Sequence, residues 1–394
     1  MKTKKLIYTA LILIFSSSLL SAQEIDNNEL AKRILTKAFN VKEGDVIVIN
    51  GGQHTLDLLA AISMEASKLG AVVTTRINTD KITQSYFQDV PEKYYGNSTP
   101  YFMKWLKLVN VWINLPEIEN YEAVYKNVSD EKVAKMNKAN QSFLDTYNTF
   151  KIKGGYVEYP TKSMADVYKI DFEVFKTMQW NAINADYTKI SENAKKIEKL
   201  LKASKKVEIT TEKGTQLSFS VTGRQCVIGD GMIDKEDEKS GLFVRNWLSF
   251  PDGNIYVSAI ENSGNGKVFV PKDVCNYEPL ENVSFNVKNG KLSDYKAEKG
   301  GDCFMKSWNQ YTGPKDMISG FQIGLNPGLK VMEDNAEYRP ANAEGMVYIV
   351  FGDNFLGGGK NKVNGAYAYW FPITNATVKI DGKVLVKDGK LMLD

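Results

Sequence analysis

The sequence has few of the residues that most often carry out catalysis. Its 394 positions contain one histidine, His54, and three cysteines. No histidine follows His54 and no GxSxG motif is present, which argues against a Ser-His-Asp triad in the second half. Cys226, Cys275 and Cys303 have no CxxC spacing, so either one pair forms a disulfide and leaves one thiol, or all three stay reduced and buried.

The chain also lacks an N-terminal apolar run as long as the roughly 20 residues of a membrane-spanning helix. Three lysines precede the short apolar run Leu6 to Phe15, and small residues surround Ala22. This arrangement is typical of a secretory signal peptide, predicted over residues 1–22. No cysteine follows to accept a lipid, so we expect a secreted or periplasmic protein without a membrane anchor after cleavage.

An excess of charge of one sign is absent as well. The formal charge is +3, and removing the three lysines of the signal peptide brings the mature chain to 0. This balance argues against nucleic acid or an anionic membrane surface as a partner. At 43% hydrophobic, 11% aromatic and 25% charged residues, the composition is that of a globular protein.

The first half alternates between helical and strand patterns. Helices are predicted over 29–39, 56–69, 101–108, 130–147, 171–180 and 187–203, and strands over 46–49, 71–75, 109–114 and 154–157. The alternation predicts an α/β N-terminal domain, residues 23–204, with a parallel or mixed sheet. The turn at Gly51 and Gly52 lacks GxGxxG and the P-loop lysine, so we interpret it as βα-turn geometry and His54 as an ordinary polar residue.

From Lys206 onward the pattern changes to short alternating runs separated by Asn-Gly and Asp-Gly turns. This pattern predicts antiparallel hairpins, and therefore a β-rich α+β C-terminal domain over residues 205–394. Within it, the apolar run Met346 to Phe351 breaks into the glycines Gly357 to Gly359. A strand that ends in such a loop often carries functional residues.

Six blocks of sequence occur in an order that suggests a family. They are Val41–Asp45, Glu65–Ala71, Lys213–Phe219 followed by Gly223–Arg224, Phe250–Tyr256, Gly324–Pro327 and Gly352–Asn354. In this order they resemble the M29 family of metallo-aminopeptidases, the aminopeptidase T group. The resemblance implies the two-domain fold above, two metal ions, commonly zinc or cobalt, in the C-terminal domain, and a homodimer.

The departures from the family pattern lie at the metal ligands. The resemblance places the ligand positions at Asn254, Gly320, Tyr348, Phe355, Ala366 and Ala368. These side chains bind a divalent ion weakly or not at all, whereas two ions need carboxylates and imidazoles. We therefore predict a catalytically degenerate homologue that has no metal cofactor and acts as a binding or structural protein, with a peptide or other small ligand in its cleft.

The alternative is an aminopeptidase that releases N-terminal amino acids with an atypical zinc or cobalt site. It requires carboxylates such as Glu261, Glu344 and Asp353 to converge within about 5 Å.

Two further runs have alternative interpretations. The acidic run Asp230, Asp234, Glu236, Asp237 and Glu238 is either solvated or a calcium site, and the aromatic run Tyr367, Tyr369, Trp370 and Phe371 either packs in the core or lines a peptide or sugar pocket.

Overall fold

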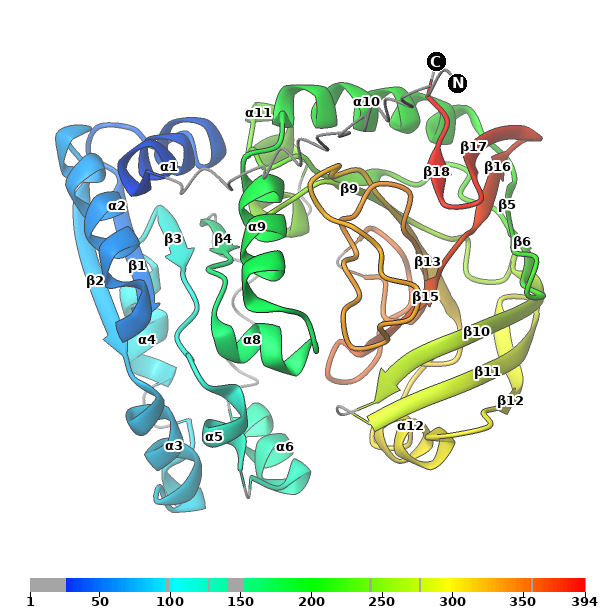
Figure 1. The fold of residues 1–394 in the computed structure, drawn as a ribbon, viewed down its shortest axis with the longest axis horizontal. Helices are drawn as coiled ribbons and strands as arrows, with labels where there is room; N and C mark the ends of the chain where they lie inside the picture. Colours follow the sequence, from blue (N-terminus) through cyan, green and yellow to red (C-terminus); the bar gives the residue numbers. More distant parts are fainter. Residues whose placement is uncertain are drawn as a thin grey trace, which may run out of the picture.

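The computed structural model describes residues 26–96, 99–126, 128–139, 152–240, 243–275, 278–355 and 357–393. The predicted signal peptide lies outside these ranges, as does the end of the predicted helix 130–147. Figure 1 shows a parallel sheet with its helices on one side of the molecule and antiparallel sheets on the other. The predicted order, an α/β part followed by a β-rich part, is confirmed.

The N-terminal half is built on a parallel sheet with the strand order β2-β1-β3-β4-β8. Its strands are β1 (Val46–Gly52), β2 (Val72–Asn78), β3 (Val111–Asn114), β4 (Lys153–Val157) and β8 (Trp247–Phe250). The helices are α1 (Asn27–Arg33), α2 (Leu56–Lys68), α3 (Asp80–Gln88), α4 (Thr99–Leu106), α5 (Tyr121–Tyr125), α6 (Asp130–Ala139), α8 (Lys162–Val167), α9 (Phe172–Ile183) and α10 (Tyr187–Ala203).

Side-chain alternation along β1 gives this sheet two covered faces. Ile47 and Ile49 belong to the main core together with Leu58 of α2. Val48 points to the opposite face, where it clusters with Leu106 of α4 and with Trp112. A strand with apolar residues on both faces is expected in a sheet that helices cover on both sides.

One strand of the parallel sheet comes from the second half of the sequence. β8 pairs in parallel with β4, with Gly154 opposite Trp247 and Val157 opposite Phe250. The indole of Trp247 lies directly on Gly154, where a Cβ would collide with it. The predicted boundary at residue 204 is therefore crossed by strand pairing, although α10 ends at Ala203 and β5 begins at Val207.

The C-terminal half contains two antiparallel sheets, with the orders β12-β11-β10-β6-β5-β16-β17-β18 and β15-β14-β13-β9-β7. The strands of the first are β5 (Val207–Thr210), β6 (Gln216–Phe219), β10 (Asn265–Cys275), β11 (Glu278–Lys288), β12 (Lys291–Lys296), β16 (Thr377–Ile380), β17 (Lys383–Lys387) and β18 (Lys390–Leu391). Those of the second are β7 (Cys226–Gly229), β9 (Asn254–Ser258), β13 (Ile318–Gly324), β14 (Val347–Gly352) and β15 (Ala368–Ile373). Two short helices, α11 (Lys235–Lys239) and α12 (Gly301–Trp308), complete this half.

The predicted hairpin turns are present. Between β11 and β12, Asn289 and Gly290 have φ values of 50° and 77°, and between β16 and β17, Asp381 and Gly382 have 46° and 85°. Two successive positive φ values are the requirement of the tight hairpin turns that Asn-Gly and Asp-Gly sequences favour.

The core of this half lies between the two sheets. The ring of Phe285 on β11 lies 5.4 Å from that of Phe351 on β14 and 4.8 Å from that of Phe371 on β15. Cys275 at the end of β10 forms a disulfide with Cys303 of α12, while Cys226 is a buried free thiol. Of the two cysteine arrangements open from the sequence, the one with a single disulfide is therefore the one found.

The helix predicted over 29–39 is divided. α1 ends at Arg33, and residues Ile34–Ala38 continue as a π-helical turn in which Ile34, Leu35 and Ala38 are buried. None of the helices in the described ranges is long and apolar enough to span a bilayer.

Candidate functional site

The sheet β15-β14-β13-β9-β7 has one face in the core and the other directed toward α8 and α9. Val347, Ile349 and Phe351 of β14 are fully buried in the main core. Tyr348, between them, points to the opposite side and clusters with Phe175 of α9. The structure thus separates a core face from a face turned to the N-terminal half, which we call the cleft face.

Strand register places on the cleft face four of the six positions that the resemblance predicts as metal-ligand positions. Gln322 pairs with both Tyr348 and Tyr256, and residues paired across neighbouring strands share a face. Alternate residues along one strand also share a face, so four of these positions lie on the cleft face: Asn254, Gly320, Tyr348 and Ala368. Phe355 and Ala366 lie outside the strands, after β14 and before β15.

The side chains of the cleft face hold a segment of chain laid across it. This crossing segment, Arg339 to Asn342, accepts three hydrogen bonds from three different strands. The donors and acceptors are Tyr348 Oη to the Arg339 carbonyl at 3.1 Å, Gln322 Nε2 to the Ala341 carbonyl at 3.1 Å, and Asn254 Nδ2 to Asn342 Oδ1 at 3.0 Å. Positions expected to bind metal therefore bind backbone and amide groups of the chain itself.

Asn254 is committed to this network as a donor. Its Nδ2 also donates to Asp252 Oδ1 at 3.1 Å. Asp252 is 3% exposed, and burial raises the pKa of its carboxyl group to about 7. With Nδ2 engaged in this way, the side chain has only a neutral carbonyl oxygen to offer a cation, which is a weaker ligand for zinc or cobalt than the carboxylate of glutamate.

Tyr348 is likewise a donor. It is 4% exposed, and burial raises the pKa of its phenol to about 12. The hydroxyl therefore keeps its proton near neutral pH and directs it to the Arg339 carbonyl. A neutral phenol held in this way is a poor ligand for a divalent ion.

Gly320 lies beneath an aromatic ring. An ideal Cβ on Gly320 would come within 2.8 Å of the Tyr256 hydroxyl oxygen, and one on Gly357 within 2.7 Å of Tyr256 Cε1. Tyr256 is held in this position by its contact with Ser319 Oγ at 2.9 Å. The phenol ring occupies the space that a carboxylate at position 320 would need.

The remaining three positions offer no side-chain ligand atom. Phe355 is 54% exposed, and Lys362 Nζ lies 5.4 Å from its ring centroid. Ala366 adopts φ 52° in the exposed loop before β15, and Ala368 begins that strand. Alkyl and phenyl groups have no lone pairs for a metal ion.

The aromatic run on β15 divides between the two faces. Phe371 is fully buried in the core, whereas Trp370 is 38% exposed and lies on the cleft face. The Trp370 ring lies 5.7 Å from that of Tyr256 and 6.2 Å from that of Tyr348. The core interpretation is right for Phe371 and for Tyr367 and Tyr369, which pack against the main core, whereas Trp370 adds to the aromatic group on the cleft face.

The donor set at these positions does not fit a dinuclear metal centre, since two divalent ions require several carboxylates or imidazoles. Nor do the carboxylates of the alternative site converge. Glu261 is ion-paired with Arg224 at 2.6 Å. Glu344 precedes β14 and Asp353 follows it, so a six-residue strand about 20 Å long separates them. In the part of the chain that the structure describes, no group of three or more His, Cys, Asp or Glu could hold a metal ion.

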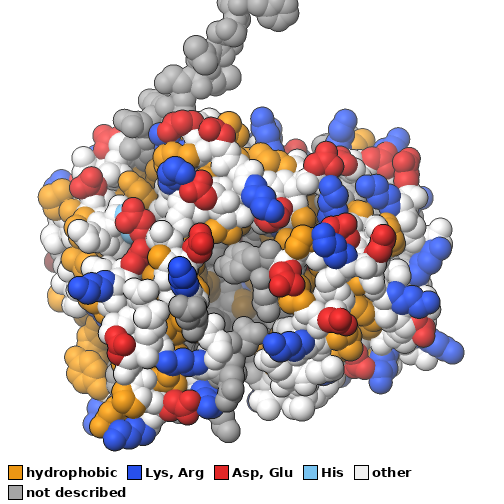
Figure 2. All heavy atoms as spheres, turned by 60° about the horizontal axis from the view of Figure 1, so that its bottom comes forward, with side chains coloured by type: hydrophobic (Ala, Val, Ile, Leu, Met, Phe, Trp, Pro, Cys, Tyr) orange, Lys and Arg blue, Asp and Glu red, His pale blue; other side chains and the backbone are white. Residues whose placement is uncertain are grey.

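A cavity of about 370 Å³ lies between the two halves of the molecule. Residues from both halves line it, among them Glu158, Gln179, Glu337, Arg339 and Asn342. Burial raises the pKa of the Glu158 carboxyl group, and Gln179 Oε1 is buried without a hydrogen-bond partner in the described chain. The lining of this cleft cavity therefore includes side chains that can accept hydrogen bonds. On the surface of the molecule, Figure 2 shows charged side chains of both signs interspersed.

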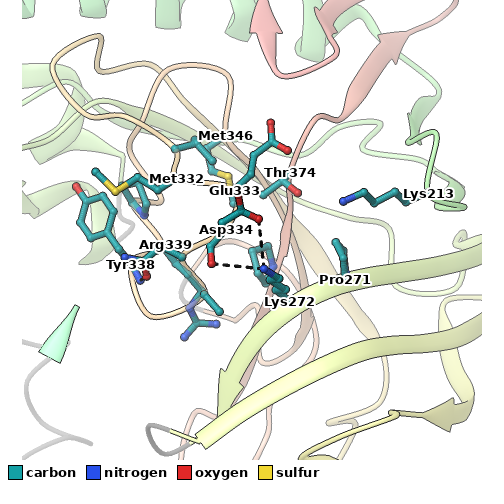
Figure 3. Close-up of a pocket in the computed structure, with 15 residues that line it drawn as sticks. Lys213, Pro271, Lys272, Met332, Glu333, Asp334, Tyr338, Arg339, Met346 and Thr374 are labelled. Atoms are coloured by element: carbon teal, nitrogen blue, oxygen red, sulfur yellow. Dashed lines mark hydrogen bonds and ion pairs between the residues drawn. The ribbon is translucent and has the colours of Figure 1, made fainter. Parts of the chain in front are cut away.

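A smaller cavity of about 70 Å³, drawn in Figure 3, shares Tyr338, Arg339 and Pro340 with the first. Lys272 Nζ contacts Asp334 Oδ1 there at 3.4 Å. Arg339 forms an ion pair with the buried Asp273. The crossing segment thus forms a wall shared by two cavities and is anchored on both sides.

The comparisons with known proteins agree with this architecture. The sequence matches the profile of the family described as Thermophilic metalloprotease (M29) over residues 24–316, about three quarters of the chain. The protein belongs to the M29 family. As a family, M29 is metal-dependent, so the donor set described above is a departure within this M29 protein.

Two solved structures resemble this M29 chain. Wild-type AmpT from Thermus thermophilus matches with a TM-score of 0.72 at 14% identity, covering 93% of this chain and 99% of AmpT. A 2,5-dihydroxypyridine dioxygenase from Pseudomonas putida matches with a TM-score of 0.56 at 14% identity, covering 94% and 99%. No curated protein sequence matches. At such identities the structural likenesses concern the fold alone.

The other candidates from the sequence have structural partners. Asp234 caps α11 in a capping box with Asp237, and Asp237 pairs with Arg245 at 2.8 Å. The buried Asp230 accepts a hydrogen bond from Ser191 at 2.6 Å. The acidic run is thus neither fully solvated nor gathered around a common point.

His54 lies in the short 3-10 turn before α2, and its ring is 6.4 Å from that of Tyr159. Burial lowers the pKa of its imidazole. Its Nε2 is buried and has no hydrogen-bond partner among the residues described. It is a neutral, half-buried side chain of the N-terminal half.

Three residues of the site had not been singled out in the sequence. Tyr256 and Gln322 occupy the cleft face between the family ligand positions, and Arg339 lies in the crossing segment. Strand alternation from Asn254 and Gly320 would have placed Tyr256 and Gln322 on this face. No local pattern marks Arg339, whose partner Asp273 is 66 residues away.

Proposed function

We propose that this M29 protein is an exported, non-hydrolytic member of its family, which uses the cleft between its two halves to bind a ligand. The observation that carries the proposal is the overlap at Gly320, where the Tyr256 ring fills the space of a metal-binding carboxylate. The hydrogen bonds of Asn254 and Tyr348 to the crossing segment support it. Hydrolysis by an M29 enzyme would need a metal-activated water that this donor set does not hold.

A peptide or a similar small ligand suits the cleft cavity. Its volume of about 370 Å³ falls in the range of small-molecule sites. Glu158 and Gln179 offer polar groups, and Tyr168 and Tyr338, whose rings lie 5.4 Å apart, supply aromatic surface to its lining. Aromatic walls with a few polar groups are typical of sites for peptides.

Export is supported by the N-terminal pattern of residues 1–22 and by the Cys275–Cys303 disulfide. Disulfides persist in the periplasm and outside the cell, whereas they are rare in the cytosol. The two observations are independent, because one concerns the leader and the other the folded chain.

The test is to dialyse the purified mature chain against zinc and then cobalt, remove free metal, and measure bound metal together with hydrolysis of aminoacyl p-nitroanilides. We expect well under one metal ion per chain and no hydrolysis above the buffer rate. A zinc aminopeptidase carried through the same steps is the control. Stoichiometric metal with chelator-sensitive hydrolysis would refute the proposal.

A further inference from the structure

A second cavity, of about 460 Å³, lies at the carboxyl ends of the parallel strands of the N-terminal half. Four neighbouring strands each contribute one polar residue of a single register row to its lining: Arg76 from β2, Asn50 from β1, Asn114 from β3 and Tyr156 from β4. The chain runs from β1 to β2 on one side and returns to β3 on the other. Ligands of open α/β sheets bind where the strand order reverses in this way.

Helix α4 covers the sheet face beside this cavity. α4 packs over Val48 and Trp112 through Leu106. The ring of Phe102 on α4 and that of Trp112 on β3, 5.4 Å apart at 69°, line the cavity together with the row of polar residues. The lining thus combines an aromatic surface with a row of polar side chains at the strand ends.

Charges of both signs line this cavity without neutralising each other. Arg76 makes no ion pair with any described carboxylate, and its guanidinium lies 5.0 Å from the Phe102 ring centroid. Glu117 and Glu158 also make no ion pair with a described cation, although Glu117 Oε2 accepts a hydrogen bond from Asn78 at 3.1 Å. Burial first, and then the charges of these two carboxylates, raise the pKa of Tyr156, which lines the same cavity.

A buried amide completes the polar set. Asn50 is 3% exposed and donates to Asn114 Oδ1 at 2.9 Å. Its own Oδ1 has no hydrogen-bond partner among the residues described. A buried acceptor without a partner costs free energy that a donor on a ligand would recover.

We propose that this cavity is a binding site for a small zwitterion, a free α-amino acid or a dipeptide. Arg76 binds the carboxylate of the ligand, Glu117 and Glu158 accept from its ammonium group, and the aromatic rings contact its side chain. A nucleotide suits the cavity less, because Arg76 is the only cation among the described residues that line it and the sequence has no GxGxxG motif. The site is separate from the cleft cavity, although Glu158 lines both.

The test is isothermal titration calorimetry of the mature chain with L-phenylalanine, the dipeptide Gly-Phe, 2-phenylethylamine and 3-phenylpropionate. The last two probes lack the carboxylate and the ammonium group, respectively. We expect saturable one-to-one binding of at least one zwitterion. Each singly charged analogue should have an affinity at least about tenfold lower than that zwitterion, because it lacks one charge-assisted hydrogen bond.

Variants assign the binding to this cavity and not to the cleft. Arg76→Gln and Glu117→Gln alter residues that line only this cavity, and each should weaken zwitterion binding about tenfold or more. In Arg76→Gln, binding of 2-phenylethylamine should stay unchanged. The matched controls Lys104→Gln and Glu119→Gln remove one exposed charge nearby, outside the lining, and should bind as the parent chain does.

Two results would overturn the proposal: no saturable heat with either zwitterion up to about 10 mM, or zwitterion binding that survives both Arg76→Gln and Glu117→Gln. Circular dichroism of each variant confirms that the fold is retained. If the mature chain binds metal and hydrolyses peptides but also shows the zwitterion binding described above, the proposed function is refuted and this second site still stands.

Discussion

The hydroxyl oxygen of Tyr256 lies 2.8 Å from the point where a Cβ on Gly320 would stand. The carbonyl oxygen of Val257 lies closer still to that point, so any Cβ at position 320 would force the backbone, the Tyr256 side chain or both to shift. Gly320 has no positive φ to explain its identity. Close approach therefore favours glycine here, and the same close approach opposes a carboxylate at this predicted ligand position.

The first prediction concerns this overlap. Gly320→Ala should lower the free energy of unfolding by about 1–3 kcal/mol, because the added methyl group overpacks the cleft face. Tyr256→Ala also destabilises the fold because it removes a packed ring, and its coupling with Gly320→Ala should offset only part of the cost of the methyl group, since the Val257 carbonyl remains. Urea denaturation of the two single variants and the double variant gives the coupling free energy between positions 256 and 320. A coupling free energy as large as the whole cost of Gly320→Ala would show that the backbone contact is unimportant.

A second prediction tests how the crossing segment is held. Tyr348→Phe removes the hydrogen bond to the Arg339 carbonyl and should lower the free energy of unfolding by about 0.5–1.5 kcal/mol. Tyr101→Phe is the control, because Tyr101 is 72% exposed. Limited proteolysis should cleave near Arg339 faster in Tyr348→Phe than in the control. Equal cleavage in both would mean that this bond does not fix the segment.

The third prediction is a dependence of stability on pH. Burial raises the pKa of Asp252 from 3.8 to about 7. Between these values the folded chain keeps a proton that the unfolded chain releases, so stability falls as pH rises, by at most about 1.4 kcal/mol per pH unit. Asp252→Asn should flatten the slope between pH 4 and about 7, as measured by urea denaturation. The exposed Asp57→Asn should keep the parent slope.

The fourth prediction concerns the cysteines. The Cys275–Cys303 disulfide closes a loop with a sequence separation of 28, and its loss in Cys303→Ser should cost about 3–4 kcal/mol of stability. Thiol titration of the unreduced parent chain should find one thiol in denaturant, Cys226, and almost none in the native state. Burial also raises the pKa of that thiol to about 12. Three thiols in denaturant would contradict the disulfide.

Much of the fold could be predicted because its signals are local. Helical periodicity predicted α10 over 187–203 to the residue, and the Asn-Gly and Asp-Gly turns indicated the hairpins. The division of the helix 29–39 was missed, because its apolar spacing continues through the π-helical turn. The insertion of β8 beside β4 was missed because pairing across some 90 residues leaves no local pattern.

The candidate site could be predicted in part for the same reason. Alternation along strands is enough to bring Asn254, Gly320 and Tyr348 onto one face once the strands pair. The crossing segment could not be foreseen, since its contacts join residues such as Asn254 and Asn342 that are far apart in the sequence. The cysteine pairing also depends on tertiary distance, so the sequence left it open.

The pairing of β8 with β4 determines how this molecule can be dissected. A fragment that stops at residue 204 would leave the edge of β4 unpaired and strip the indole of Trp247 from Gly154. An exposed edge strand of this kind invites pairing with other chains. The N-terminal sheet therefore has its full width only when the second half of the chain, up to residue 250, is present.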